Sequence, residues 1–331
     1  MYNFFMKKAI IFCNSHGYGD ILHCRQGARW VIDKLGDQFN YFFIHTKNKD
    51  TCFIHDDVKV ISAPHTFYSC TALQFKQSFK SEYFNDALWV DVWAASFEKM
   101  KAIQGIGHKL PDENGNYHEG CPEIQDSTIW QAKLYEEKVA AVNDFLIENF
   151  STKQLEVPDH KEFVCKWNSN PKYKFFADKL INDTSHYDMR VMICNGNTTS
   201  GQRRNYIYED ILSDYIKDNP NICFFLTSKI NEIKTNNVYY IDDYFPIPNL
   251  DEIEYLHKFC DVIVTSQSGP GCLSFTDAVV YDENKTLILF CVDTIDWYFA
   301  GGTCAYIRTQ NFEDSNVLNL IKDTIERKLN K

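Results

Sequence analysis

The 331-residue sequence lacks a basic character, paired cysteine motifs and long apolar runs, and each absence argues against a class of protein. Its formal net charge is −11, whereas a nucleic-acid binder needs a basic surface for the phosphate backbone, so we expect no nucleic-acid partner. None of the 12 cysteines stands in a CxxC pair, which disfavours a zinc ribbon or a thioredoxin-type redox site. No apolar run approaches the roughly 20 residues that a membrane-spanning helix needs.

What is present is the composition of a folded globular protein, with 44% hydrophobic and 24% charged residues. Most cysteines lie within apolar runs, where a reduced cysteine behaves as a small hydrophobic residue, so we expect a reducing, cytoplasmic environment. The length leaves room for two domains that each bury a core.

The segment from Ala9 to His23 predicts a strand, a glycine-rich turn and a helix. Its apolar start is too short for a helix and is typical of a buried strand. Apolar residues then recur at helical spacing until Gly36, where we expect the helix to stop. Ligands of open α/β sheets bind in the crevice at the carboxyl ends of such strands, so this turn is a candidate site.

Asp20 closes this turn and is the candidate catalytic carboxylate. Chemistry that joins a sugar to a hydroxyl needs a base within hydrogen-bond reach of that hydroxyl. The alternative is a helix N-cap, and the turn alone favours it, because Asp is a preferred capping residue and the full dinucleotide-binding glycine pattern is absent. The candidate residues for contact with an acceptor are the neighbours His16, Gly17, Tyr18 and Gly19.

Strand and helix patterns alternate along the chain, which predicts parallel sheets with crossover connections. The polar segment 151–160 has the character of a domain boundary, so we expect domains at 1–155 and 156–331. A long loop at 105–122 is either a binding loop or a plain connector. We expect strands at 9–14, 41–45, 58–61, 87–93, 189–194, 222–227, 238–241, 261–265 and 286–292. We expect helices at 21–35, 126–149, 173–181, 208–217 and 250–259, one that ends near 278, and one at 314–328.

The loop 195–205 is a candidate diphosphate site, because it follows a predicted buried strand and precedes a predicted helix. It offers the hydroxyls of Thr198 and Thr199 and the guanidinium groups of Arg203 and Arg204. Helix dipoles and arginine forks both favour phosphate. The alternative is an exposed loop whose arginines pair with the acidic residues that open the helix.

A second polar turn follows the strand predicted at 261–265. The backbone N–H groups of this turn and the helix start that follows can take an anion or a ribose. Its candidate donor-binding residues are Ser266, Gln267, Ser268 and Gly269. The alternative is a tight turn whose glycines serve only its backbone geometry.

With these pieces placed, the chain resembles the heptosyltransferase-like glycosyltransferases of family 9. The closest match is the run GDILH at 19–23, preceded by Ser15, which looks like the opening strand, turn and helix of that family. The threonine pair at 198–199 and the arginines at 203–204 look like its donor-phosphate loop. The run QSGP at 267–270 resembles its Asp-Ser/Thr-Gly segment.

The resemblance implies an α/β protein of the GT-B fold, in which two Rossmann-like domains face each other across a cleft. It implies an inverting transfer in which Asp20 is the base, the N-terminal domain holds the acceptor and the C-terminal domain holds a nucleotide-sugar donor. The diphosphate of the donor is then expected near Arg203 or Arg204. The last helix is a candidate for packing back on the N-terminal domain.

Two positions depart from the family pattern. The Asp of its last motif is Gln267 here, and its usual His, three residues past the glycine, is Cys272. Both positions belong to the expected donor site. They leave the nucleotide and the sugar open, and they allow a donor other than ADP-heptose.

The expected activity is therefore glycosyl transfer of a heptose or another sugar to a hydroxyl of a surface glycan, of lipopolysaccharide or capsule type. Its partners are a nucleotide sugar and a glycan or glycolipid acceptor, and its place is the cytoplasm or the inner face of the membrane, with peripheral contact at most. We expect no cofactor and no metal site, because adjacent acids such as Asp242 and Asp243 are more often solvated. Two alternatives stay open: a nucleotide-sugar epimerase of the same fold, and a non-catalytic protein that binds a nucleotide sugar or glycan.

Overall fold

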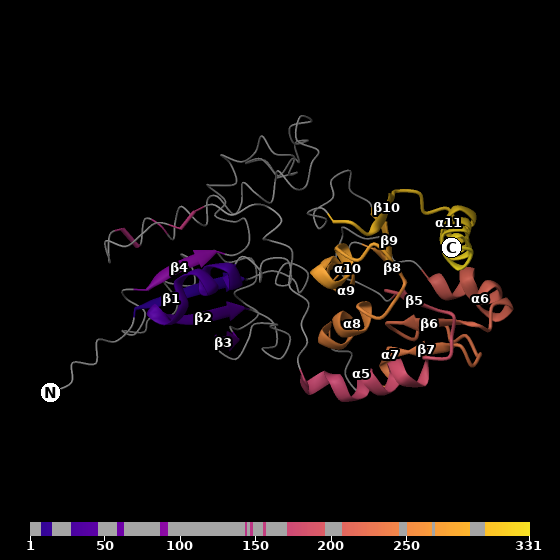
Figure 1. The fold of residues 1–331 in the computed structure, drawn as a ribbon, viewed down its shortest axis with the longest axis horizontal. Coiled ribbons are helices and arrows are strands. Elements are labelled where there is room, and N and C mark those ends of the chain that lie inside the picture. Colours follow the sequence, from indigo (N-terminus) through magenta and orange to yellow (C-terminus); the bar gives the residue numbers. More distant parts are fainter. Residues whose placement is uncertain are drawn as a thin grey trace, which may run out of the picture. The chain divides into compact units, whose positions relative to one another are not determined.

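The chain divides into two compact units, one of residues 1–165 with 295–300 and the other of residues 166–294 with 301–331 (Figure 1). In both units the strands run parallel. The computed structural model describes residues 8–14, 28–45, 58–62, 87–91, 143, 146–147, 155–156, 171–195, 207–244, 250–266, 269–291 and 302–331.

The described part of the first unit is built on a four-stranded parallel sheet in the order β3-β2-β1-β4. The strands are β1 (Ala9–Asn14), β2 (Asn40–His45), β3 (Lys59–Ser62) and β4 (Leu88–Asp91). A helical stretch at 28–35 lies between β1 and β2 and ends where Gly36 takes a φ of +59°. This left-handed conformation favours glycine, so the predicted helix stop is confirmed.

Alternate residues of β1 belong to two separate apolar clusters. Ile10 and Phe12 pack with Val31 and Ile32 of the helical stretch, whereas Ile11 belongs to the second cluster. Successive side chains of a strand point to opposite faces, so both faces of this sheet are covered. Burial on both faces is the reason why the strands of parallel sheets are apolar throughout, and it explains why the sequence revealed them.

The second unit holds a six-stranded parallel sheet in the order β10-β9-β8-β5-β6-β7. Four of these strands, β5, β6, β8 and β9, consist almost wholly of fully buried residues. The strands are β5 (Met189–Ile193), β6 (Ile222–Leu226), β7 (Val238–Tyr240), β8 (Val262–Ser266), β9 (Thr286–Phe290) and β10 (Ala305–Thr309).

The helices of the second unit cover this sheet, and α6 and α11 lie side by side (Figure 1). Val317, Ile321 and Ile325 of α11 join the same apolar cluster as Leu212 and Ile216 of α6. The apolar face of the last helix therefore lies in the core of the second unit. The helices are α5 (Pro171–Asp183), α6 (Tyr208–Asp218), α7 (Ile241–Tyr244), α8 (Leu250–His257), α9 (Gly269–Cys272), α10 (Asp277–Val280) and α11 (Asp314–Leu329).

Two expectations about the second unit need correction. The single helix expected to end near 278 is three short pieces, namely α9, the 3-10 turn η7 (Leu273–Phe275) and α10, because Thr276 adopts an extended conformation with φ −88° and ψ 159°. The strand β10 was not expected. It lies at the edge of the sheet with exposed and half-buried residues, so it lacks the apolar run of its neighbours.

Candidate functional site

The carboxyl ends of β5, β6 and β8 form the candidate site. These strands are neighbours in the sheet and run parallel, so their carboxyl ends lie at one edge. A polar residue stands at each end: Asn195 after β5, Thr227 after β6 and Ser266 at the end of β8, each at most 2% exposed. In open α/β sheets this edge is where ligands bind.

Ser266 is the described residue that best fits a role in holding a ligand. Its side chain is buried, and Oγ has no hydrogen-bond partner in the part of the chain that the structure describes. A buried hydroxyl without a partner costs about 1–3 kcal/mol, so an incoming hydrogen-bonding group at this position would be favoured.

The turn after β8 depends on a glycine for close packing. At Gly271 a Cβ atom would collide with the carbonyl oxygen of Ser266 and lie 2.5 Å from Oγ1 of Thr265. Its φ is not in the left-handed region, which among the described glycines only Gly36 occupies. Gly271 therefore lets α9 pack against the end of β8. Glycine is needed here because there is no room for a Cβ atom, and not because of a left-handed backbone conformation.

Asn195 lies at the centre of a buried hydrogen-bond network. Its Nδ2 donates to Oε1 of Glu209 and to the carbonyl oxygen of Ser228, both at 2.7 Å. Its Oδ1 accepts from the backbone N–H of Ser228 at 2.9 Å and from Oγ1 of Thr227 at 3.1 Å. Both protons of the amide and its oxygen are thus engaged, which fixes its orientation.

Glu209 and Asp210 lie in the first turn of α6, and the carboxylate of each accepts a hydrogen bond from an asparagine side chain. Oε1 of Glu209 also accepts from the backbone N–H of Ile230 at 3.2 Å, while Oε2 is buried without a partner among the described residues. Oδ1 of Asp210 accepts from Nδ2 of Asn231 at 2.7 Å. These are the acidic residues that the sequence offered as alternative partners for the arginines of the loop.

A cysteine and a histidine meet beneath the site. Sγ of Cys194 lies 3.4 Å from Nε2 of His257, and both residues are 0% exposed. Burial lowers the pKa of His257 to about 4, so the imidazole is neutral at pH 7. A fully buried neutral imidazole serves packing, and it is poorly suited to the proton transfers of an epimerase.

Asp242 and Asp243 both contact Lys229. Nζ of Lys229 lies 2.9 Å from Oδ2 of Asp243, and the backbone N–H of Lys229 donates to Oδ2 of Asp242 at 3.2 Å. The ammonium also lies 5.2 Å from the ring centroid of Tyr240. Within the described ranges no three His, Cys, Asp or Glu side chains gather in a way that could hold a metal ion.

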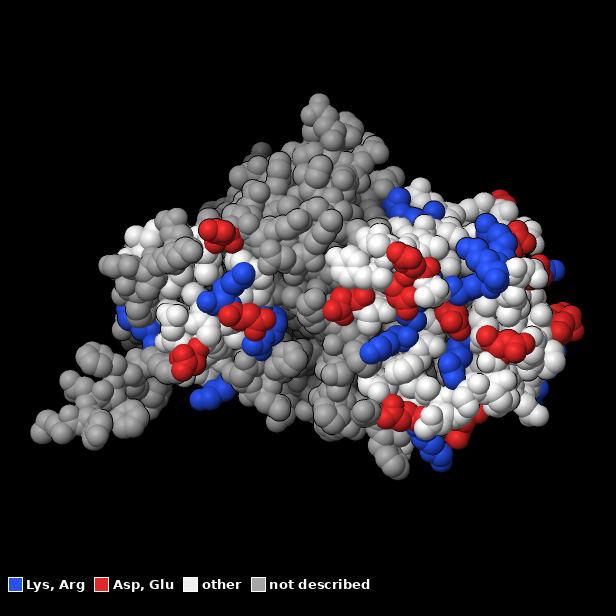
Figure 2. Space-filling view, viewed as in Figure 1, with Lys and Arg blue, Asp and Glu red and all other residues white. Residues whose placement is uncertain are grey.

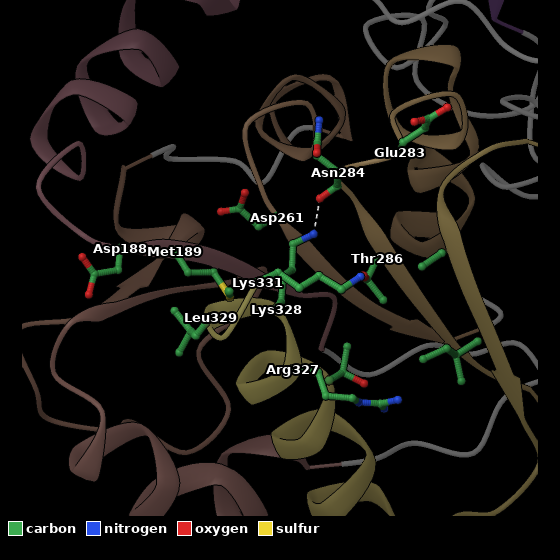
Figure 3. Close-up of a pocket in the computed structure, with 13 residues that line it drawn as sticks. Asp188, Met189, Asp261, Glu283, Asn284, Thr286, Arg327, Lys328, Leu329 and Lys331 are labelled. Carbon is green, nitrogen blue, oxygen red and sulfur yellow. Dashed lines mark hydrogen bonds between the residues drawn. The ribbon is translucent and has the colours of Figure 1, made fainter.

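A cavity of about 600 Å³ lies at the opposite, amino edge of the same sheet (Figure 3). Its walls come from the starts of β5, β8, β9 and β10 and from the end of α11. Acidic Asp188 and Asp261 oppose basic Arg327 and Lys328, and Nζ of Lys328 donates to the carbonyl oxygen of Asn284. The cavity has a balance of acidic and basic side chains and lies at the edge away from the candidate site, so it does not favour a diphosphate.

On the face that Figure 2 shows, acidic and basic side chains are interspersed over the described surface of both units. No continuous basic patch covers the described residues on that face. In the described ranges, no helix is long and apolar enough to cross a bilayer.

Two of the predicted site residues, Ser266 and Gly269, are among the described residues. Ser266 ends β8 and Gly269 begins α9, so both lie at the carboxyl edge, as the sequence predicts. Sequence reasoning did not single out Asn195, although an asparagine directly after a buried strand was a usable signal, and it offered Glu209 only as a partner for the arginines of the loop. The other predicted site residues lie outside the described residues: Asp20, His16, Gly17, Tyr18, Gly19, Thr198, Thr199, Arg203, Arg204, Gln267 and Ser268.

No protein-family model and no curated protein sequence matches the chain. Among solved structures, the ADP-heptose lipopolysaccharide heptosyltransferase II of E. coli has a TM-score of 0.54 at 11% identity, over 97% of this chain and 99% of that one. A glycosyl transferase family 9 protein from Veillonella parvula has a TM-score of 0.50 at 10% identity, over 96% of this chain and 89% of that one. At such identities the likeness is one of fold. The predicted α/β fold class of GT-B type and the predicted structural resemblance to family 9 are confirmed.

Proposed function

We propose that this protein is an inverting, metal-independent glycosyltransferase. It transfers a sugar from a nucleotide-sugar donor to a hydroxyl of a surface glycan, of lipopolysaccharide or capsule type. The observation that carries the proposal is the likeness in fold, over nearly the whole chain, to a heptosyltransferase whose name specifies ADP-heptose. A fold hosts many functions, so the proposal also rests on the candidate site itself.

The two turns predicted to bind the donor leave adjacent strands. β5 and β8 pair in parallel, with Ile193 opposite Val264, and Cys194 donates its backbone N–H to the carbonyl oxygen of Val264 at 2.8 Å. Two residues further along the chain come Asn195, which follows β5, and Ser266, which is the last residue of β8. This register supports one shared donor site for the two turns.

Each candidate residue has a distinct role in the proposed site. Arg203 and Arg204 bind the diphosphate and stabilise the charge that grows on it as the bond to the sugar breaks. The hydroxyls of Thr198 and Ser266 donate hydrogen bonds to the nucleotide sugar. Preorganised hydrogen-bonding and charged groups of this kind lower the activation barrier, because they need no rearrangement while charge develops.

Asp20 is the proposed base on the acceptor side. It follows β1, an inner strand of the first sheet, by six residues. Its carboxylate removes the proton of the acceptor hydroxyl as the oxygen attacks the anomeric carbon and the nucleoside diphosphate leaves. A positioned base of this kind contributes about 100-fold to 10,000-fold in rate.

A binding screen followed by a turnover assay tests the proposal. Thermal unfolding is measured with ADP-, GDP-, UDP- and CMP-sugars, because a ligand that binds only the folded state raises its stability. Any sugar nucleotide that binds is then incubated with lipopolysaccharide-core or capsule fragments, and release of the nucleotide is measured. We expect one nucleotide class to bind and its release to require the acceptor.

The same assay separates the two alternatives. Conversion of the sugar nucleotide to its epimer without an acceptor would replace the proposal with an epimerase. Tight binding with neither transfer nor epimer formation over the whole acceptor panel would indicate a non-catalytic binding protein.

A further inference from the structure

A buried hydrogen bond joins the two ends of the segment 196–206, which carries the proposed diphosphate-binding residues. Asn195 directly precedes this segment and Glu209 follows it, and Nδ2 of Asn195 donates to Oε1 of Glu209 at 2.7 Å. We propose that Asn195 and Glu209 are positioning residues that hold these ends together and so set the affinity of the site for diphosphate. This inference rests on the proposed function.

Burial makes this link strong. Asn195 is 2% exposed and Glu209 is 1% exposed, so water cannot replace either partner. The low dielectric of the interior strengthens a hydrogen bond between buried groups. Removing one partner leaves the other with one hydrogen bond fewer in the interior, where water does not replace it.

Further bonds tie this link to the rest of the edge. Oγ1 of Thr227 donates to the carbonyl oxygen of Asn195 at 2.7 Å, and Asn195 exchanges two bonds with the backbone of Ser228. Oε1 of Glu209 also accepts from the backbone of Ile230. The two ends of the segment are therefore anchored to the chain that leaves β6, rather than to each other alone.

Glu209 is placed to act through shape rather than through its charge. One oxygen, Oε1, carries both of its hydrogen bonds, whereas Oε2 has no partner among the described residues. A glutamine can keep both bonds by placing its amide oxygen at the position of Oε1. An alanine loses both of them and leaves Nδ2 of Asn195 with one acceptor.

The test measures affinity for inorganic pyrophosphate and for ADP and UDP by titration calorimetry. We expect N195A and E209A to weaken pyrophosphate binding at least tenfold and E209Q to stay within twofold of the wild type. N237A is the matched control, because Asn237 is 3% exposed and its Nδ2 donates to three backbone carbonyls at the amino edge of the same sheet. N237A should lower the thermal unfolding midpoint as much as N195A while leaving pyrophosphate affinity unchanged.

Each outcome separates the positioning role from the proposed function. If the wild type binds neither pyrophosphate nor a nucleoside diphosphate, both the donor site and the positioning role are overturned. If the wild type binds and folded N195A and E209A bind equally well, only the positioning role is overturned. The same holds if N237A weakens binding as much as N195A does, or if E209Q loses as much as E209A.

A third variant keeps the test decisive if N195A does not fold. T227V keeps the volume of the side chain but removes the bonds from Oγ1 to Asn195. We expect a threefold or greater loss of pyrophosphate affinity in T227V. If N195A does not fold, unchanged affinity in T227V would overturn the positioning role, as would equal losses in E209A and E209Q.

Discussion

Protonation of the buried His257 should make the protein less stable in mild acid. The imidazole is 0% exposed, and burial lowers its pKa from 6.5 to about 4. Its contribution to stability is complete above pH 6.5, because the group is then neutral in both states. As the pH falls from 6.5 towards 4, the unfolded chain binds a proton that the folded protein does not, so stability is lost.

The size of the loss follows from these two pKa values. At pH 5 the unfolded imidazole is almost fully protonated and the folded one is largely neutral. While only the unfolded imidazole is protonated, each pH unit lowers the free energy of unfolding by about 1.4 kcal/mol. The loss between pH 7.5 and pH 5 is therefore about 2 kcal/mol. Below the folded pKa of about 4 both states are protonated, and the loss levels off at about 3 kcal/mol.

Urea unfolding of the wild type and of H257Q at several pH values isolates this contribution. Gln cannot titrate, so other groups contribute equally to the two proteins and cancel in the difference. We expect the wild type to lose about 2 kcal/mol more than H257Q between pH 7.5 and pH 5. Parallel curves for the two proteins would refute the argument that burial keeps this imidazole neutral.

Three further outcomes follow from the described residues. G271A should lower the free energy of unfolding by about 1–3 kcal/mol, because the added methyl collides with the carbonyl oxygen of Ser266; a wild-type value in urea unfolding would contradict this close packing. D243N should change stability little, because the ion pair with Lys229 is partly solvent-exposed and therefore screened; a large drop in the thermal midpoint would show otherwise. Turnover measured after treatment with a chelator should equal that of the untreated protein, and its loss with recovery on added Mg²⁺ would contradict the metal-independent mechanism.

The sequence predicted the strands of both sheets well because most of them are buried on both faces. The apolar runs at 189–194, 222–227 and 286–292 coincide with β5, β6 and β9 to within two residues. Burial on both faces imposes such runs, and short apolar runs bounded by polar turns are a strong local signal. The edge strand β10 has no such run, so its sequence gives no comparable signal.

The details of the site depend on contacts between residues far apart in the chain, which a single sequence does not reveal. Asn195 meets Glu209 14 residues away and Ser228 33 residues away, and neither spacing marks a known motif. The break in the helix expected to end near 278 lies at Thr276, which adopts an extended conformation that its neighbours in sequence do not reveal. The position of Ser266 at the end of a strand was predictable because it follows an apolar run, whereas the network beside it was not.

Donor binding and turnover, both measured in D20N, test whether Asp20 is the base. D33N is its control, because Asp33 lies on the helical stretch that follows β1 and pairs at the surface with Arg29 at 2.6 Å. If Asp20 is the base, D20N binds the donor as the wild type does but transfers sugar about 100-fold to 10,000-fold more slowly, while D33N does both normally. Near-normal transfer by D20N would contradict that role.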